Sequence, residues 1–323
     1  MRKFSLSTLG PLAALILLIV VGALLNPNFL SAGNITNVLA RSAFTGMIAI
    51  GMTFVITSGG IDLSVGSMAA FIAGMMILAM NALIPTLGIG VPLVLAGMAV
   101  ALAVGLAAGF VNGALITRVG IEPFIVTLGT MGIFRSLVTW IADGGTLSLN
   151  FDARQFYRPV YYGGLFGIAW PIIVFAVTAV VGEVVMRHTR FGRHIEAIGS
   201  NDKVARYSAV NVENTRLMAY VFLGLLVGLA TILYVPRLGS ASGSTGLLWE
   251  LEAIAAVIIG GTALKGGYGR VWGTVVGVLI LSLIDNILNL ADLVSPYLNG
   301  AIQGVIIVLA VVLQRGKSTA EGR

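Results

Sequence analysis

The stretch from Leu63 to Thr117 reads LSVGSMAAFIAGMMILAMNALIPTLGIGVPLVLAGMAVALAVGLAAGFVNGALIT and carries no charged residue. A second uncharged run extends from Leu9 to Ala40. About 20 apolar residues suffice for a helix to cross a bilayer core of roughly 30 Å. Because both runs are continuously apolar rather than alternating, they indicate helices and not the strands of a closed barrel. The chain is 58% hydrophobic and 10% charged, so we predict an all-α, polytopic membrane protein.

The apolar pattern predicts about ten spans in a single transmembrane domain that covers residues 1–323. The predicted spans are 9–25, 35–58, 66–84, 91–117, 121–142, 169–186, 217–236, 251–264, 271–291 and 297–314. The first run is too long for the apolar region of a signal peptide, and no small-residue cleavage site follows it, so we expect it to remain as a helix. The longest polar loops are an inner one at 187–216 and an outer one at 143–169.

The Lys and Arg residues predict the orientation, because loops on the cytoplasmic side are enriched in both. Ten spans with the N-terminus inside place three of these residues outside, namely Arg154, Arg158 and Arg237. The same topology places fourteen inside, namely Arg2, Lys3, Arg118, Arg187, Arg190, Arg193, Lys203, Arg206, Arg216, Lys265, Arg270, Arg315, Lys317 and Arg323. We therefore expect a multi-pass protein of a bacterial inner membrane, in contact with lipid and with both termini cytoplasmic.

Composition argues against several classes of function. The chain has no cysteine, and its two histidines, His188 and His194, share one loop, so we expect no metal site and no cofactor. The net charge of +6 resides in loops, where orientation explains it better than nucleic acid does. Gly316-Lys317-Ser318 resembles the end of a phosphate-binding loop, but Val311 occupies the required glycine position. No catalytic constellation occurs in the spans, so we expect a transport subunit and not an enzyme.

Two weakly similar segments predict an inverted repeat. Residues 60–64 (GIDLS) precede Ala69-Ala70 as residues 246–250 (GLLWE) precede Ala255-Ala256, and Asn112 precedes a proline much as Asn286 does. The predicted topology gives these pairs opposite orientations, as in the two halves of many transporters. We predict two inverted halves of five helices. Glycines four apart, at 105, 109 and 113 and at 224 and 228, indicate close packing of helices within one subunit.

The inner loop has the features of a docking element. Asn201 or Asp202 can cap a short amphipathic helix that runs to Tyr207. Such a helix either lies on anionic lipid or fits a groove on a soluble partner, and the residues alone leave both alternatives open.

Four segments resemble the permeases of sugar-type ABC importers, the ribose/xylose/galactose group, in matching order from about Asn28 to Val312. These segments are GMTFVITSGGIDLSVGS (51–67), PFIVTLGT (123–130), the inner-loop stretches TRFGR (189–193), EAIG (196–199) and 201–212, and ELEAIAAVIIGGT (250–262) with GGYG (266–269). Two departures are Tyr207-Ser-Ala-Val210 where the family has Leu-Ser-Gly-Ile, and Asp285 where it has asparagine.

The resemblance implies alternating access driven by a separate ABC ATPase subunit, a second permease subunit and a periplasmic or lipid-anchored sugar-binding protein. Because that protein would select the sugar, the permease would need only a weakly polar passage. The resemblance places ATPase coupling in the inner loop, at Thr189, Arg190, Phe191, Gly192, Arg193, Ala197, Gly199, Asn201, Ala205 and Arg206. An ion-coupled secondary transporter is the alternative, since broken helices fit it equally well, although no histidine-containing proton relay is evident.

Charged residues and paired glycines inside spans are candidates for the transport path. The path and helix-break candidates are Gly59, Gly60, Asp62, Ser64, Glu252, Gly260 and Gly261. Glu250 and Asp285 are further carboxylates, with Arg41 and Arg135 as candidate partners. Two alternatives stay open: Asp62 can simply cap the following helix, and the glycines can simply permit close packing.

The outer loop carries Arg154 and Arg158 beside Tyr157, Tyr161 and Tyr162. These residues either meet the binding protein, since Arg and Tyr are favoured interface anchors, or form an aromatic belt at the membrane surface.

Overall fold

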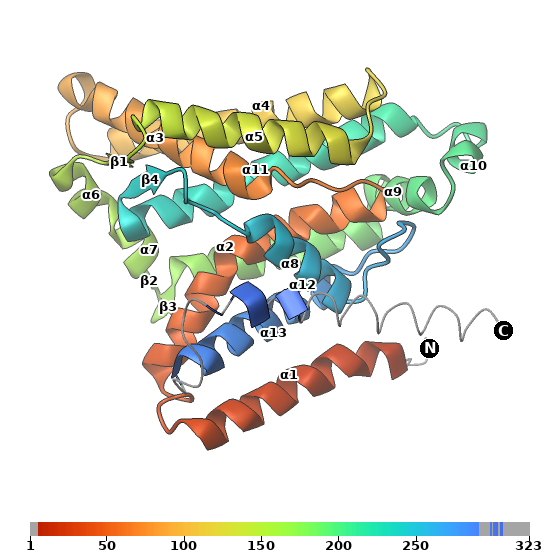
Figure 1. The fold of residues 1–323 in the computed structure, drawn as a ribbon, viewed down its shortest axis with the longest axis horizontal. Coiled ribbons are helices and arrows are strands. Elements are labelled where there is room, and N and C mark those ends of the chain that lie inside the picture. The colour runs from red at the N-terminus through yellow and green to blue at the C-terminus, as the bar shows by residue number, and fades with distance from the viewer. Residues whose placement is uncertain (1–5, 291–297, 299, 303, 306–323) are drawn as a thin grey trace.

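The computed structural model describes residues 6–290, 298, 300–302 and 304–305, and it forms a long helical bundle (Figure 1). Within these residues, seven helices are long and apolar enough to cross a membrane: α2 (Ala32–Thr57), α3 (Val65–Leu87), α4 (Val91–Thr117), α5 (Pro123–Ile141), α8 (Trp170–His188), α11 (Val212–Leu238) and α13 (Val271–Leu290). Helix α1 (Leu6–Leu25) contributes a shorter apolar stretch, and α12 (Trp249–Ile259) is short. The polytopic helical fold is confirmed. The predicted span 297–314 lies almost wholly outside the described residues, so the count of ten stays a prediction.

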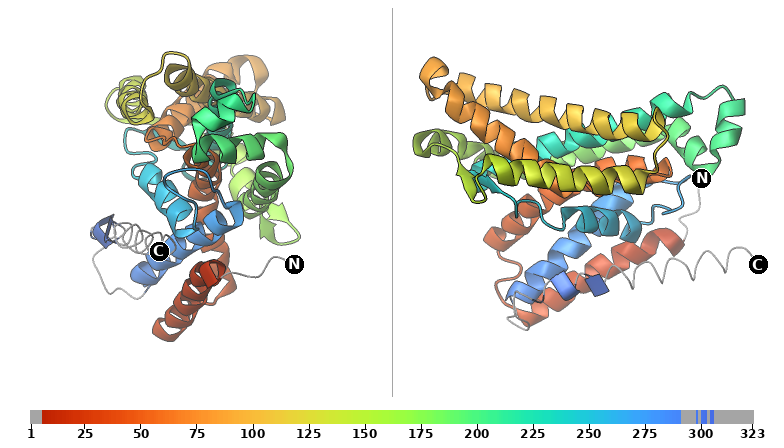
Figure 2. Two further views of the ribbon diagram at one scale, coloured as in Figure 1. Left: turned by 90° about the vertical axis from the view of Figure 1, so that its right-hand side faces the viewer. Right: turned by 45° about the horizontal axis from the view of Figure 1, so that its top comes forward.

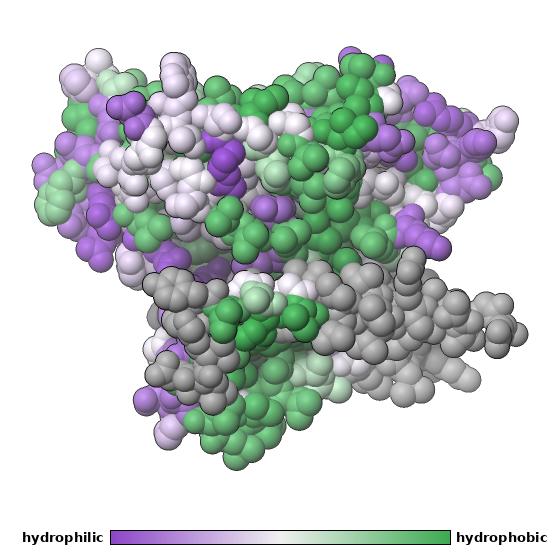
Figure 3. Space-filling model, viewed as in Figure 1, coloured by the Kyte–Doolittle hydropathy of each residue, from purple (hydrophilic) through white to green (hydrophobic). Residues whose placement is uncertain are grey.

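Short elements gather at the two ends of the bundle (Figure 1). The α6 end holds α6 (Phe151–Tyr157), α7 (Pro159–Tyr162), β1 (Thr146–Ser148), β2 (Gly164–Leu165), β3 (Ile168–Ala169) and β4 (Ser240–Ser242). Strand β1 pairs antiparallel with β4, and β2 with β3. The α9 end holds α9 (Arg190–Ser200) and α10 (Asp202–Tyr207). Figure 3 shows hydrophilic residues concentrated at both ends, with much hydrophobic surface between them. This distribution fits a bundle that crosses a bilayer lengthwise.

Helices α2 and α11 form the centre of the bundle and run antiparallel. Phe44 meets Tyr234 with ring centroids 5.4 Å apart, while Phe54, farther along α2, meets Phe222, which comes earlier in α11, at 4.9 Å. Helix α4 packs closely on α11, because a Cβ atom at Gly105 would collide with the backbone of α11 at Gly224. This contact confirms that the predicted glycine spacing serves packing within one subunit.

The arrangement of α3 and α12 supports the inverted repeat. Both helices begin inside the bundle, where Gly66 lies against the backbone of Gly246, and they run in opposite directions from this point (Figure 1). Helix pairs in the two halves also correspond: α4 packs on α11 as α13 packs on α2, and α3 packs on α4 as α12 packs on α13. Both members of the predicted sequence repeat thus precede helices that start within the membrane-spanning region.

Candidate functional site

Two capped helices cover the α9 end, as the view from that end shows (Figure 2, left). The Thr189 hydroxyl caps α9 by accepting a hydrogen bond from the Gly192 amide at 3.3 Å. Asn201 Oδ1 caps α10 by accepting from the amides of Lys203 and Val204, both at 3.1 Å. The predicted short helix to Tyr207 is confirmed, with Asn201 as its cap. Helix α9 was not expected, because Gly192 and Gly199 within it are weak helix formers. Asn211 caps α11 at Val212, so the loop ends five residues earlier than predicted.

The predicted coupling residues divide into anchors and an exposed group. Phe191 stacks on Phe54 of α2 at 6.1 Å, and Ala205 is buried. Arg206 is held by an ion pair with Glu213 at 2.8 Å. Arg190, Arg193 and Ala197 face outward, and on α10 two apolar side chains, Val204 and Tyr207, are 57% and 91% exposed. Val204 and Tyr207 are not among the predicted coupling residues, and they make the exposed group a mixed basic and apolar surface. We call this surface the docking row: Arg190, Arg193, Ala197, Val204 and Tyr207.

The turn after α10 contains a residue in an unfavourable backbone conformation. Ala209 has φ of +59°, a left-handed conformation that glycine adopts at little cost. This is the position where the resembling family has glycine. We expect Ala209→Gly to stabilise the turn by about 1 kcal/mol. Hydrogen exchange of the amides around Val210 should slow in the variant, and faster exchange there would contradict the assignment of strain to Ala209.

The two predicted glycine pairs end α2 and α12 in the same way. Gly59 and Gly261 have φ of +82° and +87°. Each turn is closed by an amide that donates to the carbonyl five residues earlier. The Gly60 amide donates to Val55 O at 3.0 Å, and the Thr262 amide donates to Val257 O at 3.2 Å. This is the Schellman pattern. The other member of each pair serves packing: a Cβ at Gly60 would meet the Tyr220 hydroxyl, and one at Gly260 would meet Gly273. The geometry therefore fits a helix break at one member of each pair and close packing at the other, and the role of these glycines in transport stays a prediction.

Helix α9 rests directly on the end of α2 and on the loop that follows α12, and glycine backbone forms the contact. The Gly267 amide donates to Thr57 O at 2.9 Å, which joins the 262–270 loop to the end of α2. A Cβ at Gly199 of α9 would collide with both atoms of this bond, and one at Gly266 would lie 3.0 Å from the amide nitrogen of Gly59. The structure thus brings Gly199, Gly59 and the loop after Gly261 into one junction, which we call the glycine junction.

Arg187 fastens α9 to the same loop. Its guanidinium bonds Glu196 Oε1 of α9 at 2.9 Å and Gly269 O at 2.6 Å, and it lies 5.5 Å from the centre of the Tyr268 ring. Glu183, one turn earlier on α8, completes the set at 3.5 Å. Nothing in the sequence separates Arg187 from the other basic residues of the loop, and the predicted coupling residues do not include it.

Asp62 and Ser64 form a buried network and do not line a cavity. Asp62 Oδ1 accepts from the amide of Ser64 at 2.8 Å and from its hydroxyl at 2.6 Å. Asn112 Nδ2 of α4 donates to Asp62 Oδ2 at 3.1 Å and to Ser64 Oγ at 2.9 Å. This geometry favours the structural role of Asp62 over pathway lining, since the carboxyl ties the segment before α3 to α4.

Arg135 contacts backbone at the start of α12. It donates to the carbonyls of Gly243 and Thr245, at 2.8 and 2.5 Å, and so holds the segment that leads into that helix. Glu250 is buried beside Gly66, where a Cβ would collide with its carboxylate. Both groups therefore organise the meeting point of α3 and α12.

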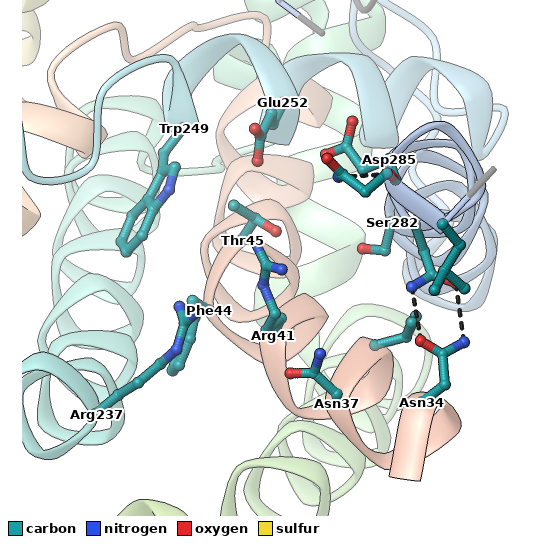
Figure 4. Close-up of a pocket in the computed structure, with 14 residues that line it drawn as sticks. Asn34, Asn37, Arg41, Phe44, Thr45, Arg237, Trp249, Glu252, Ser282 and Asp285 are labelled. Atoms are coloured by element: carbon teal, nitrogen blue, oxygen red, sulfur yellow. Dashed lines mark hydrogen bonds between the residues drawn. The ribbon is translucent and has the colours of Figure 1, made fainter. Parts of the chain in front are cut away.

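A cavity of about 320 Å³ opens between α2, α11, α12 and α13. Figure 4 shows the side chains of Arg41, Glu252 and Trp249 directed into it from different helices. Its lining consists of Asn34, Asn37, Val38, Arg41, Phe44, Thr45, Arg237, Trp249, Glu252, Ser282, Asp285, Asn286, Asn289 and Leu290. Of the predicted path and helix-break residues Glu252 lies here, together with the further carboxylate Asp285 and the candidate partner Arg41. The cavity is more polar than the weakly polar passage that we expected, because amides and charged groups far apart in sequence converge on it.

The outer loop is more ordered than predicted, and two of its three tyrosines are unavailable for docking. Tyr157 is fully buried and donates its hydroxyl hydrogen bond to Ile232 O at 2.6 Å, and Tyr161 is buried against Phe44. Their aromatic rings belong to the core, which is a correction. Tyr162 remains exposed beneath the Arg158 guanidinium, 4.9 Å from its ring centre.

Three features define a transport permease: helices that cross a membrane, an inverted core with helices that start inside it, and a capped helical surface at one end.

The comparisons with known proteins give the family. The family described as "Branched-chain amino acid transport system / permease component" matches residues 34–311. The ribose import permease protein of Bacillus subtilis is 41% identical over 96% of this chain and 93% of its own length. The D-allose transport system permease protein of Escherichia coli is 36% identical over 93% and 89%. The chain therefore belongs to this family of ABC importer permeases.

A solved structure agrees at the level of the fold. An inward-facing metal-chelate type ABC transporter superposes with a TM-score of 0.54 at 12% identity and covers 94% of this chain and 98% of its own. At this identity the likeness concerns the fold alone.

Proposed function

We propose that this chain is the membrane-spanning permease subunit of an ATP-driven importer and passes a monosaccharide across the membrane by alternating access. The related permeases named for ribose and D-allose support the substrate class. We assign the α9 end to the cytoplasm, because basic residues such as Arg187, Arg190 and Lys203 concentrate there. The chain itself would bind no nucleotide and carry no catalytic group or cofactor.

The glycine junction carries this proposal. An ATPase subunit bound to the docking row would move α9, and no flexible side chain separates the backbone of α9 at Gly199 from the end of α2 and from the loop that follows α12. Displacement of α9 would therefore reach α12 through that loop. Helix α12 carries Trp249 and Glu252 at its other end, where both line the cavity. Movement at the cytoplasmic face would thus change the opening at the centre of the bundle.

Three further partners complete the assembly. A periplasmic or lipid-anchored sugar-binding protein would meet the α6 end, where Arg158, Phe151 and Phe156 are exposed. A second permease subunit, identical or related, would share the path. Lipid would cover the apolar flanks. An ion-coupled secondary transporter is less well supported, since an ordered, exposed docking row has no role in a transporter that acts alone.

Tyr207 gives the test. Truncating an aromatic hot spot weakens an interface by 2 kcal/mol or more, so Tyr207→Ala should lower co-purification of the ATPase and ATP-dependent uptake of ribose at least tenfold. Phe166→Ala is the matched control for co-purification of the ATPase, because Phe166 is an aromatic of 94% exposure at the opposite end. Full uptake and full co-purification with Tyr207→Ala would refute the docking assignment, and absence of ATP-dependent sugar uptake by the unaltered complex would refute the function.

A further inference from the structure

Two polar stripes face each other across the cavity. Helix α2 contributes Asn34, Asn37, Arg41 and Thr45 at spacings of three and four, so they lie on one helix face. Helix α13 contributes Ser282, Asp285 or Asn286, and Asn289 at the same spacing. Polar residues inside a membrane-spanning bundle are costly and face water-filled spaces or ligands. Two such stripes at matching depth indicate a built polar site.

The charges that line the cavity balance. Arg41 and Arg237 contribute two positive charges, and Glu252 and Asp285 contribute two negative ones. A site for an anion or a cation would carry an excess of the opposite charge. The balance among the described residues therefore favours a neutral ligand that both donates and accepts hydrogen bonds.

Several lining groups have hydrogen-bonding capacity that the protein does not use. Asn34 and Asn286 bond each other, at 2.8 and 3.0 Å. By contrast, neither Arg41 nor Asn37 makes a side-chain hydrogen bond or ion pair within the described part of the chain. The guanidinium of Arg41 offers five N–H donors and the amide of Asn37 offers both donors and acceptors. Both groups line the cavity from α2, and Arg41 extends toward Thr45 and Glu252 (Figure 4).

One wall of the cavity is aromatic. Trp249 forms this wall, and the buried Phe44 lies behind it with an interplanar angle of 13° and a centroid distance of 6.2 Å. Tyr234 supports both rings edge-on. The faces of a sugar ring carry C–H groups, whereas its hydroxyls project around the rim. An aromatic wall beside paired amides, carboxylates and a guanidinium suits both features of such a ring.

We propose that this cavity is a monosaccharide-binding site within the permease, in which the ring packs against Trp249 and its hydroxyls bond Arg41, Asn37 and Glu252. The inference rests on the proposed function and deepens it, because it gives the permease a selectivity of its own. The volume of about 320 Å³ falls within the range of small-ligand pockets, roughly 300–1,000 Å³. Glu252 lies on α12, so the site opens or closes with the helix that the glycine junction moves.

Direct binding to the purified permease–ATPase complex, without binding protein, tests the site. Saturation-transfer NMR would be recorded with D-ribose, D-allose and, as a neutral solute of another class, L-leucine. We expect saturable binding of the sugars and not of leucine. Arg41→Gln should weaken ribose binding about tenfold, because it removes a hydrogen bond from a charged group. Asn37→Ala should weaken ribose binding by a similar factor, because it removes the amide that bonds a hydroxyl of the sugar. Arg118→Gln, which removes an exposed arginine from the end of α4, should leave binding unchanged.

The outcomes separate this inference from the proposed function. Ribose binding that is weakened by both cavity variants and not by Arg118→Gln supports the site. Absence of saturable binding, or equal binding by the cavity variants, overturns the site even if ATP-dependent uptake is normal. Binding of leucine as tight as that of ribose overturns the substrate class. Absence of ATP-dependent uptake by the unaltered complex refutes the proposed function. The binding measurement still tests the cavity in that case, because it does not depend on uptake.

Discussion

Replacing Gly199 with alanine is expected to reduce ATP-dependent uptake at least tenfold while the ATPase stays bound. The added Cβ would collide with Thr57 O and the Gly267 amide, both of which are backbone atoms that cannot rotate away. Forcing extra atoms into a packed contact typically costs about 1–3 kcal/mol, so α9 should lift from the end of α2 and from the loop that follows α12. The docking row points away from this contact and should remain competent. Uptake into proteoliposomes and co-purification of the ATPase, measured on one preparation, give the two readouts.

Gly33→Ala is the control for the Gly199 variant. Gly33 lies near the start of α2, and a Cβ there would meet no atom within 4 Å. Normal uptake by both variants would show that α9 does not transmit movement through the glycine junction. Loss of ATPase binding in Gly199→Ala, with a lowered melting temperature of the complex, would show that Gly199 serves folding and not coupling.

Hydropathy and charge predict the membrane fold well because the bilayer permits few alternatives. Uninterrupted apolar runs such as Leu63–Thr117 must form helices, and the structure places α3 and α4 there within a few residues. The repeat of 60–64 at 246–250 is visible for the same reason, since helices that begin inside a membrane need distinctive polar and glycine-rich starts. The glycine pairs locate both helix ends because the left-handed conformation of Gly59 and Gly261 restricts those positions to few residue types.

The cavity could not be predicted in this way. Asn37 and Asn289 belong to separate helices and Arg237 lies at the end of a third, and only the packing of α2, α11 and α13 brings them together. The stripe from Asn34 to Thr45 has helical spacing that a sequence can reveal, yet its partner helix cannot be identified without the fold. The prediction for Tyr157 and Tyr161 is wrong for the opposite reason. A loop rich in tyrosine resembles an interface, whereas α6 and α7 place both rings against α2 and α11.

Asp62→Ala is expected to destabilise the folded permease by roughly 2–5 kcal/mol, because it strips buried donors of their acceptor. Three hydrogen bonds to the Asp62 carboxylate would be lost, from the Ser64 amide, the Ser64 hydroxyl and Nδ2 of Asn112. The site has almost no solvent contact. Asp62→Asn should be milder, since its oxygen can still accept from Ser64. The Asn112 amide can also turn, because its Oδ1 is buried without a partner and would accept from the new amide.

The ranking of the two Asp62 variants separates the structural role from a role in transport. If the network only ties the segment before α3 to α4, the melting temperature of the solubilised complex should fall strongly for Asp62→Ala and slightly for Asp62→Asn. Uptake per folded molecule should then be close to normal for Asp62→Asn. If Asp62 instead carries a charge that transport requires, Asp62→Asn should fold normally and transport nothing. That second pattern would return Asp62 to the path and would also revive ion coupling as a mechanism, because the carboxylate lies at the start of a helix that begins inside the membrane.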